Sequence, residues 1–192
     1  MNLGWKLAAT VKGEAAPGLL DTYGTERHAI AAATLDWTRA QTAAIRPDEY
    51  GSAVRDMVAL VLDTPDGAKL FADRFSGRAL RYDIPHTSED ERHAAVGLSV
   101  PDFCFTDGTR LGEKLHHGGF VLVDLRGETG LDASFDEVAD RLTLVRCECV
   151  NTLGFELVLV RPDGIIAWAT DHAGTDVMHS LTSELERYLQ KA

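Results

Sequence analysis

FVLVDL, at residues 120–125, is the stretch of this chain that says most about its fold. Apolar residues follow one another without alternation, a pattern typical of a strand that is buried on both faces. Strand patterns recur at residues 142–150, 155–160 and 165–169, and the turn sequence RPDG joins the last two. A doubly buried strand followed by a hairpin, together with the helices described next, indicates an α/β fold.

Helical patterns accompany these strands. We expect a short helix at residues 135–141, before the second strand, and an amphipathic helix at residues 177–189. The order β-α-β followed by β-β-α is that of a thioredoxin-like domain. This domain has no Cys-x-x-Cys pair, since only one residue separates Cys147 from Cys149, and we expect its thiols to be structural. The sequence therefore predicts a thioredoxin-like α/β domain without a redox pair.

The part of the chain that precedes this domain has helical rather than strand patterns. One helix begins at the N-terminus, a long one runs from about Leu19 to the step before Pro47, and two shorter ones precede Ser76. A charged stretch follows, and we expect it to form a linker or loop. The predicted organisation is a helical segment, a linker and a thioredoxin-like domain at residues 1–85, 86–99 and 100–192, respectively.

Composition limits the possible partners. Thirty acidic and 19 basic side chains give a net charge of −11, which disfavours nucleic acid and anionic membrane surfaces. No apolar run approaches the ~20 residues that span a bilayer, and the N-terminus has no signal-peptide pattern. The three cysteines favour a reducing compartment. We therefore expect a cytoplasmic protein that binds neither nucleic acid nor membrane.

The first residues of the chain carry a resemblance to a known family. The segment NLGWKLA, residues 2–8, resembles a segment that lies just beyond the last flavin-contacting loop in FAD-dependent aromatic hydroxylases of the p-hydroxybenzoate hydroxylase type. Further blocks in the family's order and spacing occur at residues 19–27, 76–82, 101–111, 115–122 and 159–168. Together they are similar to the C-terminal part of hydroxylases that tailor aromatic polyketides of the antibiotic type, which carry a thioredoxin-like domain.

The flavin-binding motifs of that family are not found in this sequence. No Gly-x-Gly-x-x-Gly follows a strand to hold a pyrophosphate on a helix N-terminus. The glycine-rich loop that faces the isoalloxazine in the family is also missing. We therefore expect FAD to be absent, predict no other cofactor, and assign no residue to cofactor binding; Asn2 and its neighbours are expected to start and pack a helix.

Three histidines are the candidate catalytic residues. His116 and His117 are adjacent, so only one of them can face a given pocket, and His86 lies in the charged linker. A neutral imidazole near pH 7 is suited to general acid–base catalysis. The alternatives are that His116 packs in the fold and that His117 and His86 are solvated. No spacing fits a metal-ligand template, so we predict no metal site.

Three further residues are candidates for binding an aromatic substrate. Tyr82 has a hydroxyl that can hydrogen-bond a phenol, Arg81 precedes it, and Trp37 lies on the long helix. An alternative role for Tyr82 is to anchor a domain seam. We expect the substrate in a cleft between the helical segment and the thioredoxin-like domain, because pockets tend to form at domain seams.

Three functions are compatible with these features. The first is a free-standing, flavin-free tailoring enzyme that acts by acid–base chemistry on a hydrophobic, polyketide-type aromatic molecule. The second is a non-catalytic partner or dimerisation subunit of a flavin monooxygenase, and the third is a fragment of such a hydroxylase. We favour the first. The apolar stripe of the long helix also predicts a homodimer or docking on a flavoenzyme; its members are Leu20, Tyr23, Ile30 and Trp37.

Overall fold

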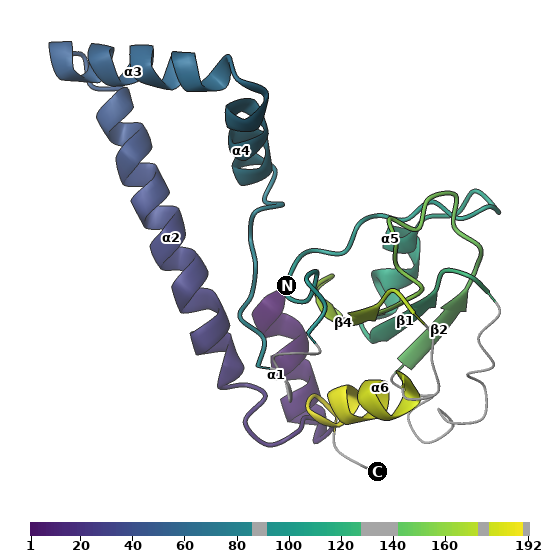
Figure 1. The fold of residues 1–192 in the computed structure, drawn as a ribbon. Coiled ribbons are helices and arrows are strands. Elements are labelled where there is room, and N and C mark those ends of the chain that lie inside the picture. The colour runs from purple at the N-terminus through teal and green to yellow at the C-terminus, as the bar shows by residue number, and fades with distance from the viewer. Residues whose placement is uncertain (86–91, 128–141, 173–176, 190–192) are drawn as a thin grey trace. The chain divides into compact units, whose positions relative to one another are not determined.

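The computed structural model describes residues 1–85, 92–127, 142–172 and 177–189 (Figure 1). The chain divides into two compact units. The first unit combines residues 1–23 with residues 83–192, and the second comprises residues 24–82. The N-terminal helix thus groups with the C-terminal domain, and the boundaries drawn from the sequence at residues 85 and 100 stay a prediction.

The first unit is built on a four-stranded mixed sheet with the order β2-β1-β3-β4. Strand β1 (Phe120–Asp124) pairs in parallel with β2 (Leu142–Arg146) and antiparallel with β3 (Leu157–Val160), which continues antiparallel into β4 (Ile166–Thr170). Every residue of β1 and β3 is buried, as the uninterrupted apolar patterns predict. The predicted thioredoxin-like α/β fold is confirmed.

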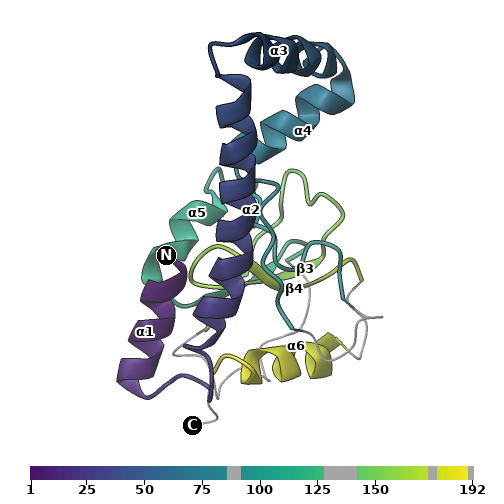
Figure 2. The same cartoon turned by 90° about the vertical axis from the view of Figure 1, so that its left-hand side faces the viewer.

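Short helices complete this domain. Helix α6 (Val177–Glu186) packs on β4 (Figure 2). The indole Nε1 of Trp168 in β4 donates to the hydroxyl of Ser180 in α6 at 3.0 Å. Helix α5 (Leu111–Lys114) and the 3-10 turn η2 (Leu115–His117) precede β1. The helix expected at residues 135–141 lies outside the described residues.

Strand β2 is shorter than expected. It ends at Arg146, whereas the sequence pattern predicts a strand that continues to Val150. Beyond Arg146 the chain leaves the sheet, and Cys149 forms an isolated antiparallel bridge with Phe105. The sulfur of Cys149 lies 3.3 Å from the carbonyl oxygen of Cys104. All three cysteines are free thiols.

Helix α1 (Asn2–Lys12) belongs to the first unit. It ends at Gly13, whose φ of 73° is left-handed and therefore suits glycine. The chain then returns to the segment after α6, where the backbone N–H of Ala16 donates to the carbonyl of Tyr188 at 3.1 Å. Trp5 packs edge-on against Phe120 of β1 with ring centroids 5.6 Å apart. The N-terminal helix is thereby fixed to the sheet domain.

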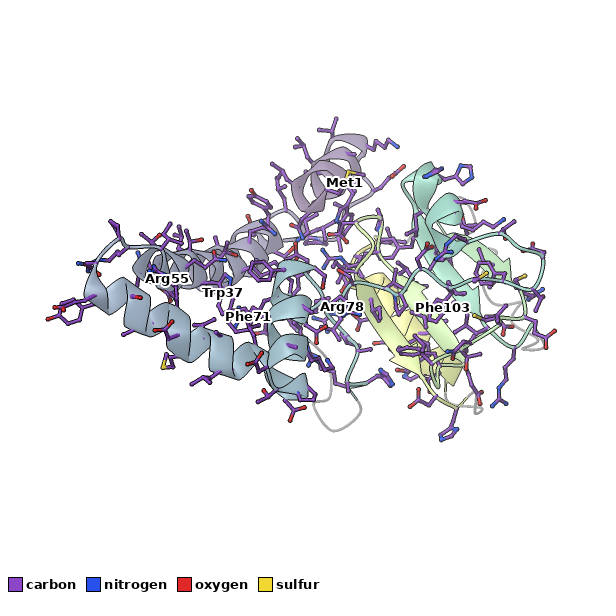
Figure 3. All side chains as sticks on the ribbon, turned by 90° about the horizontal axis from the view of Figure 1, so that it is seen from above. Met1, Trp37, Arg55, Phe71, Arg78 and Phe103 are labelled. Atoms are coloured by element: carbon purple, nitrogen blue, oxygen red, sulfur yellow. The ribbon has the colours of Figure 1, made fainter. Side chains whose placement is uncertain are left out.

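The second unit contains most of α2 (Thr22–Ala44) together with α3 (Glu49–Leu62) and α4 (Pro65–Phe75). Asp48 and Thr64 cap the last two helices, since their side-chain oxygens accept hydrogen bonds from backbone N–H groups three residues on. Figure 3 shows Trp37 of α2 beside Phe71 of α4, and their ring centroids are 5.2 Å apart. Within the described ranges, no helix combines the length and the apolar character that crossing a bilayer requires.

Candidate functional site

Helix α1 has an inverted distribution of polar and apolar side chains. Asn2 and Lys6 are only 6% and 0% exposed, whereas Leu3, Leu7 and Val11 are 41%, 46% and 79% exposed. Helices on the surface of a globular domain normally turn their apolar side chains inward. The burial of two polar side chains on α1 therefore requires specific partners inside the domain.

Asn2 finds its partner in the turn between β3 and β4. Its Nδ2 donates to Oδ2 of Asp163 at 3.2 Å. The same carboxylate receives two hydrogen bonds from Arg161, from Nε to Oδ1 at 3.1 Å and from a terminal nitrogen to Oδ2 at 2.7 Å. The side chains of Arg161 and Asp163 are 0% and 3% exposed. This is a bidentate ion pair removed from solvent, the geometry in which Arg–carboxylate pairs are strongest.

Aromatic rings surround the buried guanidinium. The carbon Cζ of Arg161 lies 5.2 Å from the ring centroid of Trp5 and 5.9 Å from that of Tyr188. A desolvated cation between ring faces gains a favourable cation–π energy. We call the set Asn2, Trp5, Arg161, Asp163 and Tyr188 the α1 anchor. It fixes the first turn of α1 to the hairpin of the thioredoxin-like domain.

Lys6 forms a second buried contact, one turn further along α1. Its Nζ donates to the hydroxyl of Thr22 at 2.6 Å, and this hydroxyl donates to the carbonyl of Leu19 at 2.6 Å. Lys6 therefore connects the middle of α1 to the segment that leads into α2. Sequence reasoning did not single out Lys6, Arg161 or Asp163 as site residues. The available signal was the i, i+4 spacing of Asn2 and Lys6 on the face opposite the leucines.

The outward face of α1 is an apolar stripe. Leu3, Leu7 and Val11 follow the i, i+4, i+8 spacing that aligns side chains along one side of a helix. We call these three residues the α1 stripe. Because the polar contacts hold the opposite face of α1 against the sheet domain, the stripe remains available to another surface.

The candidate catalytic histidines that the structure describes differ in whether they line a pocket. His116 and His117 end the turn η2, and both are exposed. His117 lines a pocket of about 170 Å³ that also contacts Trp5, whereas His116 does not line it. His86 lies outside the described residues. Of the predicted pair, one histidine therefore borders a pocket, and the catalytic role of all three stays a prediction.

The candidate substrate-binding residues belong to the second unit. Trp37 packs edge to face against Phe71, and the guanidinium carbon of Arg74 lies 5.3 Å from the ring centroid of Trp37. The hydroxyl of Tyr82 accepts a hydrogen bond from Arg27 at 3.0 Å. Arg81 is exposed. Trp37 and Tyr82 thus make packing and polar contacts within their own unit, and their predicted role in substrate binding is untested.

Three carboxylates in turns and helices have lowered pKa values, and Asp102 in turn raises the pKa of Arg110. The backbone N–H of Gly112 and the guanidinium of Arg110 lower the pKa of Asp102. The hydroxyl and backbone N–H of Thr109 lower the pKa of Asp107, and Lys69 lowers that of Asp73. Among the residues the structure describes, no cluster of three or more His, Cys, Asp or Glu side chains is arranged to hold a metal ion.

Among the residues that the structure describes, the polar side chains at the start of α1 do not fit an FAD site, because their partners lie inside the domain. Met1 caps α1 without a side-chain hydrogen bond, and the polar side chains of Asn2 and Lys6 are directed to Asp163 and Thr22. Such groups, used inside the domain, are not available to a pyrophosphate or a flavin ring.

Comparison with known proteins identifies both ends of the chain. Residues 93–192 match the model of the aromatic-ring hydroxylase C-terminal domain, and residues 1–38 match the model of an FAD binding domain. A Claviceps purpurea protein named as a monooxygenase is 44% identical over 170 residues, which are 88% of this chain and 33% of that protein.

Solved structures show the same relation. The anhydrotetracycline hydroxylase OxyS from Streptomyces rimosus superposes with a TM-score of 0.84 at 36% identity, over 97% of this chain and 38% of that one. A Diels–Alderase of the pyrroindomycin pathway superposes with a TM-score of 0.72 at 32% identity, over 100% of this chain and 36% of that one. The chain spans about a third of the length of the relatives that it matches.

Proposed function

Since the chain belongs to the FAD-dependent aromatic-ring hydroxylases and corresponds to their C-terminal region, we propose that it supports a flavin-binding domain and that the α1 stripe is the surface on which that domain packs. The carrying observation is the division of α1 between two faces. Its sequence matches a flavin-binding domain, its polar side is anchored in the C-terminal domain, and its apolar side is exposed.

The activity that we propose for the assembled protein, which is this chain with its flavin-binding domain, depends on this docking. The relatives include enzymes named for oxygenation of 12-dehydrotetracycline and anhydrotetracycline. We propose that the assembled protein tailors a hydrophobic, polyketide-type aromatic molecule, with the flavin chemistry located in the docked domain. In this role the chain holds α1 in place for the flavin-binding domain and does not supply a reacting group.

A chimera tests the docking role. The flavin-binding part of the Streptomyces rimosus hydroxylase is joined to this chain at Asn2, and FAD retained after gel filtration is measured by visible absorbance, together with conversion of anhydrotetracycline. A charge placed in an apolar interface costs several kcal/mol. Val11→Glu is therefore expected to reduce retained FAD and conversion by about tenfold or more.

Val150→Glu is the matched control, because Val150 is similarly exposed but lies outside α1. This variant is expected to behave like the unmodified chimera. Equal FAD retention and activity in the Val11→Glu and Val150→Glu chimeras would show that the stripe is not the docking surface.

A second candidate function is a flavin-free acid–base reaction on an aromatic intermediate, catalysed by this chain on its own. One observation supports it: His117 borders a pocket. Its test is conversion of an aromatic pathway intermediate by the purified chain and by the single variants His86→Ala, His116→Ala and His117→Ala. Full activity of all three folded variants would exclude histidine catalysis.

A further inference from the structure

The second unit, residues 24–82, differs from the rest of the chain in charge and in surface. It holds eight acidic and eight basic side chains, whereas the other residues hold 22 and 11, so the whole net charge of −11 lies outside it. Of the 17 large apolar side chains that are exposed in the described part of the chain, ten belong to this unit. Two copies of the chain therefore repel each other least, and gain most apolar contact, through their second units.

Helix α3 has an apolar outward face. Tyr50, Met57 and Leu60 are 70%, 59% and 72% exposed, and their spacing of seven and three residues aligns them along one side of the helix. Gly51 is buried and Val58 is half-buried on a different side, which packs within the unit. The three exposed residues, which we call the α3 face, have the spacing by which one helix packs along another.

An acidic row borders the α3 face. Glu49, Asp56 and Asp63 follow one another at intervals of seven residues, which is close to two helical turns, and all three are exposed. Residues 48–66 hold five acidic side chains and one basic side chain, Arg55, which donates to backbone carbonyls at the end of α2 and just beyond it. The surface of α3 thus combines apolar side chains with negative charge.

The segment from α4 to the end of the unit has the opposite charge. Residues 67–82, which we call the basic segment, hold four basic side chains and one acidic side chain, a net charge of +3. The side chains of Lys69 and Arg78 are 73% and 70% exposed, and both pair with Asp73. Phe75 is 67% exposed in the same segment. The basic segment therefore presents positive charge beside apolar surface.

The α3 face and the basic segment are complementary, but they do not cover each other within one chain. Helix α4 turns away from α3 where the two meet (Figure 1), and the α3 face stays exposed. A second copy, related by a two-fold axis, can place its basic segment on α3 and receive α3 on its own basic segment in return. Such reciprocal contacts bring opposite charges together at both places.

We propose that the second unit is a self-association surface, in which the α3 face of one copy packs on the basic segment of another copy and the reverse. Apolar side chains form the centre of each contact, and the acidic row lies opposite Lys69 and Arg78 of the second copy. This surface goes beyond the proposed function, because the α1 stripe belongs to the first unit. Either proposal can fail without the other.

Charge reversal on each side of the contact tests this arrangement in the full chain, with sedimentation equilibrium as the readout. Asp56→Lys combined with Asp63→Lys reverses the acidic row, and Lys69→Glu combined with Arg78→Glu reverses the basic segment. Each double variant places like charges opposite each other, so the dissociation constant of the dimer is expected to rise about tenfold or more. Circular dichroism checks that the helices are retained, which is expected because exposed ion pairs contribute little to stability.

Lys12→Glu combined with Lys114→Glu is the matched control. It adds the same negative charge as the reversal of the basic segment, but on the first unit. The dissociation constant of this control is expected to stay within about threefold of that of the unmodified chain, because the first units lie outside the contact. A loss of the dimer in the control as well would show that only total charge matters, and would overturn the interface.

An equimolar mixture of the two reversed double variants is decisive. In a mixed dimer, one contact joins two reversed surfaces and the other joins two unmodified ones, so opposite charges meet at both. The mixture is therefore expected to dimerise within about threefold of the unmodified chain, although each variant alone does not. A monomeric unmodified chain at about 100 µM, a reversed variant that dimerises normally, or a mixture that stays monomeric would each overturn the proposal.

Discussion

The first unit, at residues 1–23 and 83–192, encloses a sheet whose central strands are fully buried. The second unit, at residues 24–82, is described throughout by the structure. It buries only two large apolar side chains, Ile30 and Tyr82. The second unit instead exposes Ile45, Tyr50 and Met57 at 74%, 70% and 59%. Exposed apolar groups of this kind normally mark a surface that another element covers. The comparison teaches that the first unit has its own core, and that the second unit depends on a cover.

The largest effect is expected from breaking the buried ion pair of the first unit. Asp163→Asn removes a charge and leaves the guanidinium of Arg161 buried without its counter-ion, which costs about 3–5 kcal/mol of unfolding free energy. Asp36→Asn removes a partner of Arg39 in an exposed pair and is expected to cost about 0–1 kcal/mol. Urea unfolding followed by fluorescence measures both. Equal losses would mean that burial does not distinguish the two pairs.

Two glycines of the helical segment sharpen the comparison with effects of opposite sign. A Cβ added to Gly67 would lie 2.0 Å from the carbonyl oxygen of Val61, so Gly67→Ala is expected to destabilise by about 1–3 kcal/mol. Gly24 has open space around it, and Gly24→Ala is expected to stabilise by about 0.5–1 kcal/mol. Thermal unfolding by circular dichroism tests the pair, and the same sign for both would contradict it.

Self-association tests whether the second unit finds its cover in another copy. We expect a dimer in sedimentation experiments at about 100 µM, with twice the monomer mass of 20.9 kDa, because Ile45, Tyr50 and Met57 are large apolar side chains exposed on the same unit. Met57→Glu should shift the species to monomer, while Arg55→Glu, which changes charge but not apolar area, should shift it less. A monomer at every concentration would leave the flavin-binding domain as the expected cover.

The smallest effect concerns pH. The backbone N–H of Gly112 and Arg110 hold the pKa of Asp102 below its usual range, so its stabilising contribution is present above an unfolded pKa of about 3.9 and is lost as pH falls through the lower folded value. The side chain is half exposed, so the contribution is small. Asp102→Asn should narrow the difference in urea midpoint between about pH 6 and pH 3. An unchanged difference would show that Asp102 does not contribute.

Local signals were sufficient for most of the fold. The apolar run of β1, the turn at Gly164, and the caps at Asp48 and Thr64 each depend on residues close in sequence, and the corresponding elements were predicted. The end of β2 was not, because Cys149 pairs with Phe105 outside the main sheet. The α1 anchor was missed for the same physical reason, since Asn2 and Asp163 are 161 positions apart. Residue type and spacing do not reveal a contact of that range.

The candidate site divides in the same way. The histidines and Trp37 were candidates because of their chemistry, but the type of a residue does not indicate what surrounds its side chain in the fold. The structure adds a pocket beside His117, and both His116 and His117 are exposed. The buried charges of the anchor are informative because of their burial, which only the folded chain displays.

Because one face of α1 is anchored in the C-terminal domain and another is exposed, mutations on the two faces would be detected by different assays. Changes at Asn2 or Lys6 would lower the stability of the C-terminal domain, and a screen for soluble protein would find them. Changes at Leu3, Leu7 or Val11 would pass such a screen, because these side chains contribute little to the domain that carries them. Their effect would emerge only as lost flavin or lost activity in the assembled enzyme. One helix thus has two classes of mutation on faces about a third of a turn apart, and each class is detected by a different assay.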